Sequence, residues 1–280
     1  MKTGEVVLPT DSLMAANFLV FLKDQGYSKF SIKLALVSLK WINSFFPGRA
    51  SEKLEDKFLD RIIASAERNM NSKKTQKSPV SKDMVAKMVE LGMNPSLADM
   101  RDSLMAALSY SLLLRSDELR HLSCKHLILN DVGLTVNIVS SKTDVFRKGK
   151  KLFLARQESQ NSVVSMLERY MVMGCLKPGD NSFLFGNISK GNCKDAIDGS
   201  KPLTYNQCRT ILLAKIDKVG CDSNAFGTHS FRSGGASSLA PKVSPFELLL
   251  SGRWADARSL RNYVEVSEER RYEISRNLFI

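Results

Sequence analysis

The stretch THSFRSGGASSLA, residues 228–240, is the most informative part of this sequence. It places a histidine and an arginine three positions apart, His229 and Arg232, and two adjacent glycines follow after one serine. On a helix this spacing brings both side chains onto one face, where such pairs are commonly plain surface neighbours. The spacing is therefore weak by itself, and its meaning depends on the sequence around it.

A second stretch, SGRWADARSLRNYV (251–264), carries Trp254 and, nine residues later, Tyr263. A tryptophan in such a place is commonly a core residue, and Tyr272 competes with Tyr263 as a candidate nucleophile. A tyrosine phenol is a weak but competent nucleophile that can also act as a leaving group. The spacing from the tryptophan favours Tyr263.

Two further stretches come earlier in the chain. LLLRSDELRHL (112–122) puts Arg115 directly after an apolar run, with Glu118 three residues on. This arrangement also fits an ordinary ion pair at a helix end. SSKTD (140–144) puts Lys142 at the head of a basic turn. The other lysines of that turn that compete with it are Lys148, Lys150 and Lys151.

Hydrophobic periodicity predicts a chain that is mainly α-helical. The predicted helices begin near residues 12, 28, 54, 81, 96, 162, 204 and 244. Capping boxes, Thr204 with Gln207 and Ser244 with Glu247, mark two of these starts. The predicted buried face of the first helix consists of Leu13, Ala16, Val20 and Phe21.

A change of period after the fifth predicted helix indicates a small β-hairpin. Alternating apolar residues predict strands at 134–141 and 150–156, joined by a basic turn. The segment 186–203 is polar and glycine-rich and is predicted to be an insertion loop. The fold class is therefore an all-helical part followed by an α+β part with a small sheet.

These elements predict two domains and a linker. The all-helical domain comprises residues 1–70, and the α+β domain comprises residues 81–280. The segment 71–80 between them is polar and basic and ends in a proline-containing turn, which is typical of a linker.

Composition narrows the class of protein. The chain has 280 residues and a formal net charge of +12, and both predicted domains are positive, which favours a long polyanion as the partner. No apolar run is long enough to span a membrane. Five cysteines without a CxxC pair favour a reducing environment over a disulfide framework. His121, Cys124 and His126 lack a fourth ligand, so we do not expect zinc.

Taken in chain order, these residues resemble the active-site set of the tyrosine recombinase (phage integrase) family. The resemblance covers nearly the whole chain and implies a SAM-like core-binding domain, a basic linker and a catalytic domain. Trp254 stands where many members have a second histidine. The motifs FRSGGAS and GRW resemble those of recombinases of eukaryotic mobile elements of the DIRS and Crypton type. The residues that carry the resemblance are Arg115, Lys142, His229, Arg232, Trp254 and Tyr263.

The resemblance implies that Tyr263 attacks a DNA phosphate and forms a 3′-phosphotyrosyl intermediate. Arg115 and Arg232 are then the cations that hold the non-bridging oxygens, since a guanidinium binds them bidentately and stays charged. Lys142 is the candidate general acid for the leaving 5′ oxygen. His229 takes the phenol proton or stabilises the transition state. No metal and no other cofactor is required.

Three other residues have supporting roles in this prediction. Trp254 offers one N–H donor, so it can bind a phosphate oxygen but cannot shuttle a proton. Glu118 orients Arg115 and caps the local helix. Arg253 stands where the family usually has a small residue, and it either binds a further phosphate or has no effect. The remaining predicted DNA contacts lie in the linker and the hairpin turn: Lys73, Lys74, Lys77, Arg147 and Lys148.

The implied partner is double-stranded DNA, held between the two domains as in a clamp. The family works as a homotetramer on two paired sites. The segment SEERRYEISRNLFI (267–280) is predicted to be an amphipathic helix that docks on a neighbouring copy in trans or folds back in cis. Its apolar residues are Tyr272, Ile274, Leu278 and Phe279.

Three functions remain open at this point. The first is an active recombinase or integrase of a transposable element, and the second is a DNA-binding descendant that has lost catalysis. The third is a strand-relaxing enzyme of the type IB topoisomerase kind. The expected location is intracellular, in the nucleus of a eukaryotic host and otherwise in the cytoplasm or nucleoid.

Overall fold

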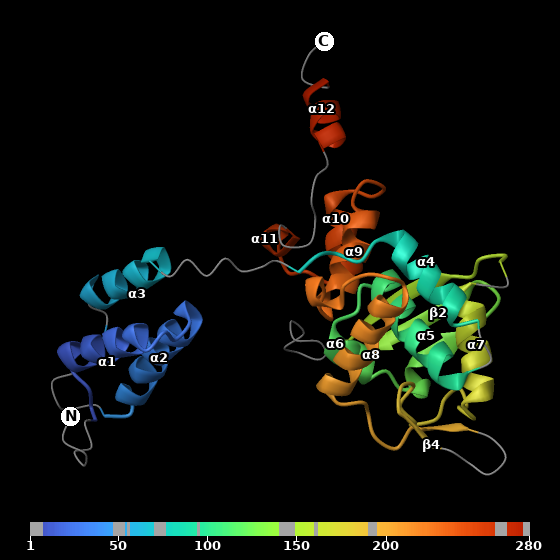
Figure 1. Cartoon of the computed structure of the whole chain (residues 1–280), viewed down its shortest axis with the longest axis horizontal. Coiled ribbons are helices and arrows are strands. Elements are labelled where there is room, and N and C mark those ends of the chain that lie inside the picture. The colour runs from blue at the N-terminus through green and yellow to red at the C-terminus, as the bar shows by residue number, and fades with distance from the viewer. Residues whose placement is uncertain are drawn as a thin grey trace. The chain divides into compact units, whose positions relative to one another are not determined.

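The computed structural model describes residues 8–46, 54, 57–69, 77–93, 96–139, 149–159, 162–189, 195–260 and 268–276. The chain divides into two compact units, Met1–Thr75 and Gln76–Ile280 (Figure 1). The boundary falls inside the predicted linker. Within the described ranges, no helix combines the length and the apolar character that a membrane span needs.

In the described part of the first unit all regular structure is helical. Side-chain caps start two of its helices: Asp11 accepts from the backbone N–H of Met14 at 2.7 Å, and Ser28 accepts from that of Ser31 at 3.1 Å. Such caps satisfy N–H groups that a helix start leaves without partners. The helices are α1 (Ser12–Asp24), α2 (Lys29–Asn43) and α3 (Lys57–Asn69).

The predicted buried face of α1 is wrong except for Ala16, which is buried. Leu13 and Phe21 are 66% and 54% exposed, and the small core of this unit instead takes Ala15 and Leu19, which are fully buried. The helix carries apolar side chains on more than one side. Periodicity alone therefore could not decide which of its faces packs against α2 and α3.

The second unit begins with two helices and a sheet that the sequence largely anticipates. The helices are α4 (Lys82–Leu91), α5 (Leu97–Ser111), α6 (Ser116–Arg120), α7 (Val163–Met173), α8 (Tyr205–Lys218), α9 (His229–Leu239), α10 (Pro245–Gly252), α11 (Ala257–Leu260) and α12 (Glu268–Arg276). Helices α4, α5, α7, α8 and α10 begin close to predicted starts, and both predicted capping boxes are present. The sequence predicts no start for α6, α9 or α11. Two short 3₁₀ turns lie at Cys124–His126 and Ser223–Ala225.

Helix α5 is the centre of this unit. Leu104, Met105 and Leu108 are fully buried, and the helix contacts α4, α7, α8 and α9 (Figure 1). Every residue from 103 to 109 is buried, so other elements enclose this part of the helix on all sides. The carboxyl end of α5, from Leu112 onward, leads directly into the segment that holds Arg115.

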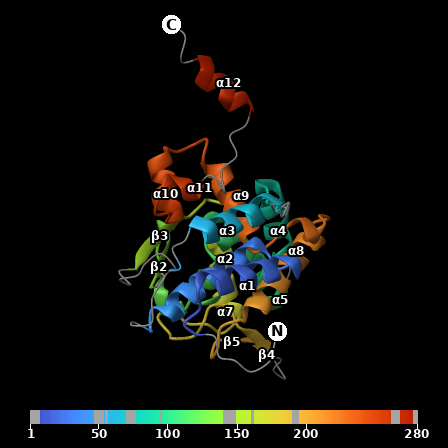
Figure 2. The same ribbon diagram turned by 90° about the vertical axis from the view of Figure 1, so that its left-hand side faces the viewer.

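The sheet confirms the predicted hairpin and adds a strand. β2 (Gly133–Ile138) pairs antiparallel with β3 (Lys150–Ala155) and with the short β1 (Leu127–Leu129). In Figure 2, β2 and β3 lie on one flank of the second unit and α8 on the other. The segment predicted as an insertion loop contains a second antiparallel pair, β4 (Asn187–Ser189) with β5 (Ala196–Asp198). Strands of three residues are too short to give a period-2 signal.

The predicted amphipathic helix at 267–280 is described in part, as α12, which contains two of its four apolar residues. Tyr272 and Ile274 are 67% and 50% exposed. Two positions apart on a helix, they point to nearly opposite sides. The other two apolar residues of the prediction, Leu278 and Phe279, lie outside the described residues.

The adjacent glycines Gly234 and Gly235 allow α9 to lie against the main chain of its neighbours. A Cβ atom on Gly234 would lie 1.9 Å from the carbonyl oxygen of Val80, and one on Gly235 would lie 2.2 Å from that of Tyr110. Both distances are impossible for real atoms, so these positions require glycine. This close approach brings Arg232, on the same helix, to the end of α5.

Replacing Gly235 with alanine should destabilise the second unit by about 1–3 kcal/mol, as is typical of overpacking against a fixed backbone. Chemical denaturation measures the free energy of unfolding. The matched control is Gly227→Ala, since a Cβ on Gly227 would meet only Lys77 Cγ at 3.7 Å, an ordinary contact. Equal stabilities of the two variants would contradict the proposed close packing.

Candidate active site

The candidate active site is built where the carboxyl ends of α5 and α10 meet. After α5 the chain turns through Leu113, which is left-handed with φ of 49°, and Leu114 N–H donates to Ser109 O at 3.1 Å. After α10 it turns through Arg253, with φ of 57°, and Trp254 N–H donates to Leu249 O at 3.1 Å. Each helix end leaves carbonyl oxygens that need other donors.

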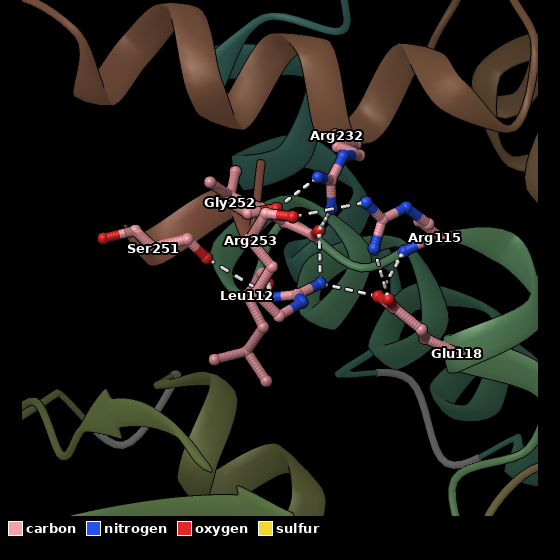
Figure 3. Close-up of polar contacts among 8 residues, drawn as sticks. Leu112, Arg115, Glu118, Arg232, Ser251, Gly252 and Arg253 are labelled. Atoms are coloured by element: carbon pink, nitrogen blue, oxygen red, sulfur yellow. Dashed lines mark hydrogen bonds and ion pairs between the residues drawn. The ribbon is translucent and has the colours of Figure 1, made fainter. Parts of the chain in front are cut away.

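Two arginines supply those donors. Arg232, from α9, donates through its two terminal nitrogens to the carbonyl oxygens of Leu113 and Gly252. Arg253 donates to Leu113 O at 3.0 Å and to Leu112 O at 3.3 Å (Figure 3). Helix carboxyl ends carry partial negative charge, so they stabilise cations placed against them. The two buried guanidiniums therefore join the two helix ends.

Trp254 covers this junction. Its ring lies over the guanidinium carbon of Arg232, 4.5 Å from the ring centroid, which is a favourable cation–π distance. A Cβ atom on Gly252 would lie 1.6 Å from the same ring. Glycine is therefore needed at position 252 to leave room for the tryptophan ring. The left-handed position that ends the helix, which glycine usually occupies, is taken here by Arg253.

Glu118 joins this junction to Arg115. One carboxylate oxygen accepts from Arg115 Nη1 at 2.7 Å, and the other accepts from the Arg115 backbone N–H at 2.9 Å. The second oxygen also accepts from Arg253 Nη2 at 2.5 Å. The carboxylate thus caps α6, orients Arg115 and pairs with Arg253 at once.

The charge on Glu118 is held by its partners. Burial by itself opposes ionisation, but the Arg253 guanidinium and the hydrogen bonds from Arg115 outweigh it, so the pKa of this carboxyl lies below its ordinary value. The Glu118 and Arg253 side chains are each 2% exposed. Glu118 therefore stays ionised at neutral pH although it is enclosed.

Arg115 is the cation of this group that reaches solvent. Its side chain is 18% exposed, whereas the Arg253 side chain is 2% exposed and the whole Arg232 residue is 1% exposed. Its Nη2 donates to the carbonyl oxygen of Arg253 at 3.4 Å, next along the chain from the Gly252 oxygen that Arg232 holds. Arg115 and Arg232 are thus anchored to adjacent carbonyls of one turn.

The structure therefore brings together part of the site predicted from the sequence. His229 begins α9, one turn before Arg232, and is exposed. Lys77 is exposed, and its Nζ donates to Asn224 O at 2.5 Å. The predicted residues that lie outside the described ranges are Lys73, Lys74, Lys142, Arg147, Lys148 and Tyr263. The structure does describe three residues that compete for these roles, and all three are exposed: Lys150 and Lys151 for that of Lys142, and Tyr272 for that of Tyr263.

The predicted DNA contact of Arg253 does not fit the structure. Its guanidinium is enclosed by Glu118 and by the carbonyl oxygens of Leu112, Leu113 and Ser251. A phosphate cannot reach it there without displacing these acceptors. No local sequence signal indicates this enclosure, because it depends on the left-handed turn at position 253.

His121, Cys124 and His126, considered above as zinc ligands, are not grouped as a metal site in the structure. His121 Nδ1 lies 2.8 Å from Asp117 O, and Cys124 is fully buried, which raises the pKa of its thiol to about 11. Across the described ranges, no three His, Cys, Asp or Glu side chains are grouped so that they could hold a metal ion.

The comparisons with known proteins agree with this geometry. Residues 80–270 match the family model described as the phage integrase family. The fold, with the arginines gathered beside a tryptophan, is that of a tyrosine recombinase, a class of DNA strand transferases. The chain belongs to the phage integrase family. No curated protein sequence matches it.

Solved structures share the fold at low identity. The XerH site-specific recombinase bound to its difH substrate has a TM-score of 0.66 at 19% identity, over 96% of this chain and 71% of that one. The Tn1549 transposon integrase bound to transposon right-end DNA has a TM-score of 0.62 at 14% identity, over 96% and 86%. A lambda integrase dimer bound to a core site has a TM-score of 0.59 at 14% identity, over 94% and 82%.

Acid should weaken the second unit through Glu118. The pKa of this carboxyl is lowered by folding from about 4.3 in the unfolded chain, so its contribution to stability is complete above about pH 5 and is lost as the pH falls through the folded-state pKa. In Glu118→Gln the free energy of unfolding should fall less between about pH 6 and about pH 3.5 than in wild type. Urea titrations at each pH measure this.

The control for this experiment is Glu168→Gln. Glu168 pairs with Arg156 at 2.5 Å, but its side chain is 41% exposed, so solvent screens the interaction. The pH dependence of this variant should stay near that of wild type. An unchanged pH dependence in Glu118→Gln would show that the carboxylate is not held as described.

Proposed function

We propose that this chain is a site-specific DNA recombinase or integrase that cleaves and rejoins duplex DNA through Tyr263. The observation that carries the proposal is the convergence of Arg115, Arg232 and Trp254 from three separate segments onto one turn, on the fold of the phage integrase family. The guanidinium of Arg115 reaches solvent, and those of Arg232 and Arg253 are buried. Glu118 is the one carboxylate that pairs with members of this group. The group therefore keeps a net positive charge that can attract a phosphate.

In the proposed reaction, the Tyr263 oxygen attacks the scissile phosphorus and the bond to the 5′ oxygen breaks. The phenol proton passes to His229, and Lys142 donates a proton to the leaving 5′ oxygen. The products are a 3′-phosphotyrosyl enzyme and a 5′-hydroxyl end. Attack by the 5′-hydroxyl of a second strand reverses the step and restores the tyrosine.

The arginines supply the electrostatic part of this proposal. Charge gathers on the non-bridging oxygens in the transition state, and Arg115 is placed to hold them because part of its side chain is accessible. Arg232 is fixed behind it by two carbonyls. Fixed cations need no reorganisation as charge develops, which is the source of their catalytic effect.

The larger assembly is also part of the proposal. Both units are basic, and the linker lysines Lys73, Lys74 and Lys77 together with Arg147 and Lys148 are the proposed phosphate contacts, in a clamp around the duplex. Four copies would act on two paired sites, with the segment after residue 267 docking on a neighbour. The kinship with DIRS and Crypton elements, and hence a nuclear location, stays a prediction.

A suicide substrate tests the reaction. A duplex nicked next to the scissile phosphate releases a short 5′-hydroxyl strand after cleavage, so the covalent enzyme–DNA product accumulates. Wild type should give this product on a denaturing gel, and Tyr263→Phe should give none, because it lacks the attacking oxygen. Tyr272→Phe is the matched control and should trap DNA like wild type. Since the target site is undefined, the probe is the DNA that flanks the gene.

The other outcomes distinguish the remaining functions. DNA binding in a gel shift without any covalent product in wild type would favour a descendant that has lost catalysis. Trapping accompanied by relaxation of supercoiled DNA, with no exchange between paired sites, would favour a strand-relaxing enzyme. Loss of trapping in Tyr272→Phe rather than in Tyr263→Phe would identify Tyr272 as the nucleophile.

Arg115→Ala should slow trapping at saturating DNA by roughly 10²–10³-fold, the effect typical of losing one preorganised charge-stabilising donor. Arg115→Lys should recover part of the rate, since it keeps a charge but not the forked geometry. Single-turnover kinetics with labelled DNA measures both. Arg258→Ala is the control, because Arg258 is exposed on α11; an equal loss there would contradict a specific role for Arg115.

A further inference from the structure

We propose that Arg253 is a positioning residue that sets the orientation of both Arg115 and Arg232 toward the scissile phosphate. The inference rests on the proposed function, since it concerns the same site. It assigns a role to a side chain that is enclosed by protein acceptors and to which the family resemblance assigns no part in the reaction.

The first observation is the backbone conformation of Arg253. Its φ of 57° and ψ of 40° are left-handed, a region that disfavours any residue with a Cβ atom and suits glycine. Arg253 thus adopts a costly backbone conformation, and the hydrogen bonds of its side chain offset that cost.

The second observation is the reach of the side chain. The guanidinium donates to Leu112 O, Leu113 O and Ser251 O, at 3.3, 3.0 and 3.3 Å, and to Glu118 at 2.5 Å. These acceptors come from the end of α5, the end of α10 and the first turn of α6 (Figure 3). One side chain thus ties together the three elements on which the site depends.

The third observation is that Arg253 shares an acceptor with each of the two proposed catalytic cations. It shares the Glu118 carboxylate with Arg115, and its own carbonyl oxygen accepts from Arg115 Nη2 at 3.4 Å. It shares Leu113 O with Arg232. A displacement of the Arg253 side chain therefore changes the contacts of both cations together.

The pairing also decides how much positive charge is left for a phosphate. If Glu118 had Arg115 as its single cationic partner, the carboxylate would neutralise the guanidinium that reaches solvent. Arg253 also pairs with one carboxylate oxygen at 2.5 Å, so the site holds three cations, Arg115, Arg232 and Arg253, for one anion. The surplus charge is close enough to act strongly on an incoming phosphate, because the buried side of the site is poorly screened.

Arg253→Lys tests this proposal, because lysine keeps the charge but cannot reach four separate acceptors. At saturating DNA the single-turnover trapping rate should fall by about tenfold or more, as expected for misplaced catalytic groups, while the dissociation constant for DNA stays within about threefold. A substrate with a neutral methylphosphonate at the scissile position should show a much smaller difference between variant and wild type, since less charge then needs stabilising.

Arg101→Lys is the matched control. Arg101 is also largely buried, 12% exposed, and pairs with Asp102 at 2.8 Å and with Gly186 O at 3.2 Å, away from the site. This variant shows how much an arginine-to-lysine change at a buried ion pair affects folding when the active site is not involved. Its trapping rates on both substrates should stay near those of wild type when equal amounts of folded protein are compared.

Two results would overturn the inference and leave the proposed function intact. One is a folded Arg253→Lys protein that traps the ordinary phosphodiester at the wild-type rate. The other is an equal loss of rate on both substrates, which indicates less active protein rather than a changed electrostatic fit. If wild type itself traps no DNA, the proposed function fails and this inference fails with it.

A second variant keeps the test decisive if Arg253→Lys does not fold. Arg253→Met combined with Glu118→Gln removes both charges, so no buried charge is left without its partner, a situation that is otherwise strongly destabilising. This double variant should also be slower than wild type on the phosphodiester, with a smaller difference on the methylphosphonate. A wild-type rate on the phosphodiester would overturn the inference.

Discussion

The site depends on one interaction: positively charged side chains bound to the carbonyl oxygens at the carboxyl ends of two helices. Arg232 and Arg253 both donate to Leu113 O, and Arg232 also donates to Gly252 O. These oxygens have no helical partners, and they carry the negative end of the helix dipole. The same hydrogen bonds therefore hold the two helix ends together and fix the positions of the cations.

This coupling explains why the surrounding sequence is so constrained. Gly235 lets α9 approach the end of α5, which brings Arg232 within reach of Leu113, and Gly252 admits the ring of Trp254. Each glycine removes a Cβ atom that would hold two main-chain segments apart. The geometry of the cations thus follows from close backbone packing rather than from the charged side chains alone.

The sequence predicted the parts of this arrangement that rest on local signals. Capping residues such as Thr204 and Ser244 gave the helix starts, and the order of Arg115, Arg232 and Trp254 gave the residues that converge. What it could not give depends on tertiary packing. The enclosure of Arg253 follows from a left-handed turn, and the exposed face of α1 follows from competition between several apolar sides.

The carbonyl oxygens that accept from Arg232 and Arg253 belong to the main chain, and they do not depend on which side chain stands at those positions. Mutation can replace the leucines at positions 112 and 113 or the serine at 251 without deleting the oxygens that the arginines use. Only a change in the path of the chain would remove them. Amino-acid identity can therefore change widely without removing this anchorage, and proteins with 14–19% identity to this chain show how far sequences of this fold differ.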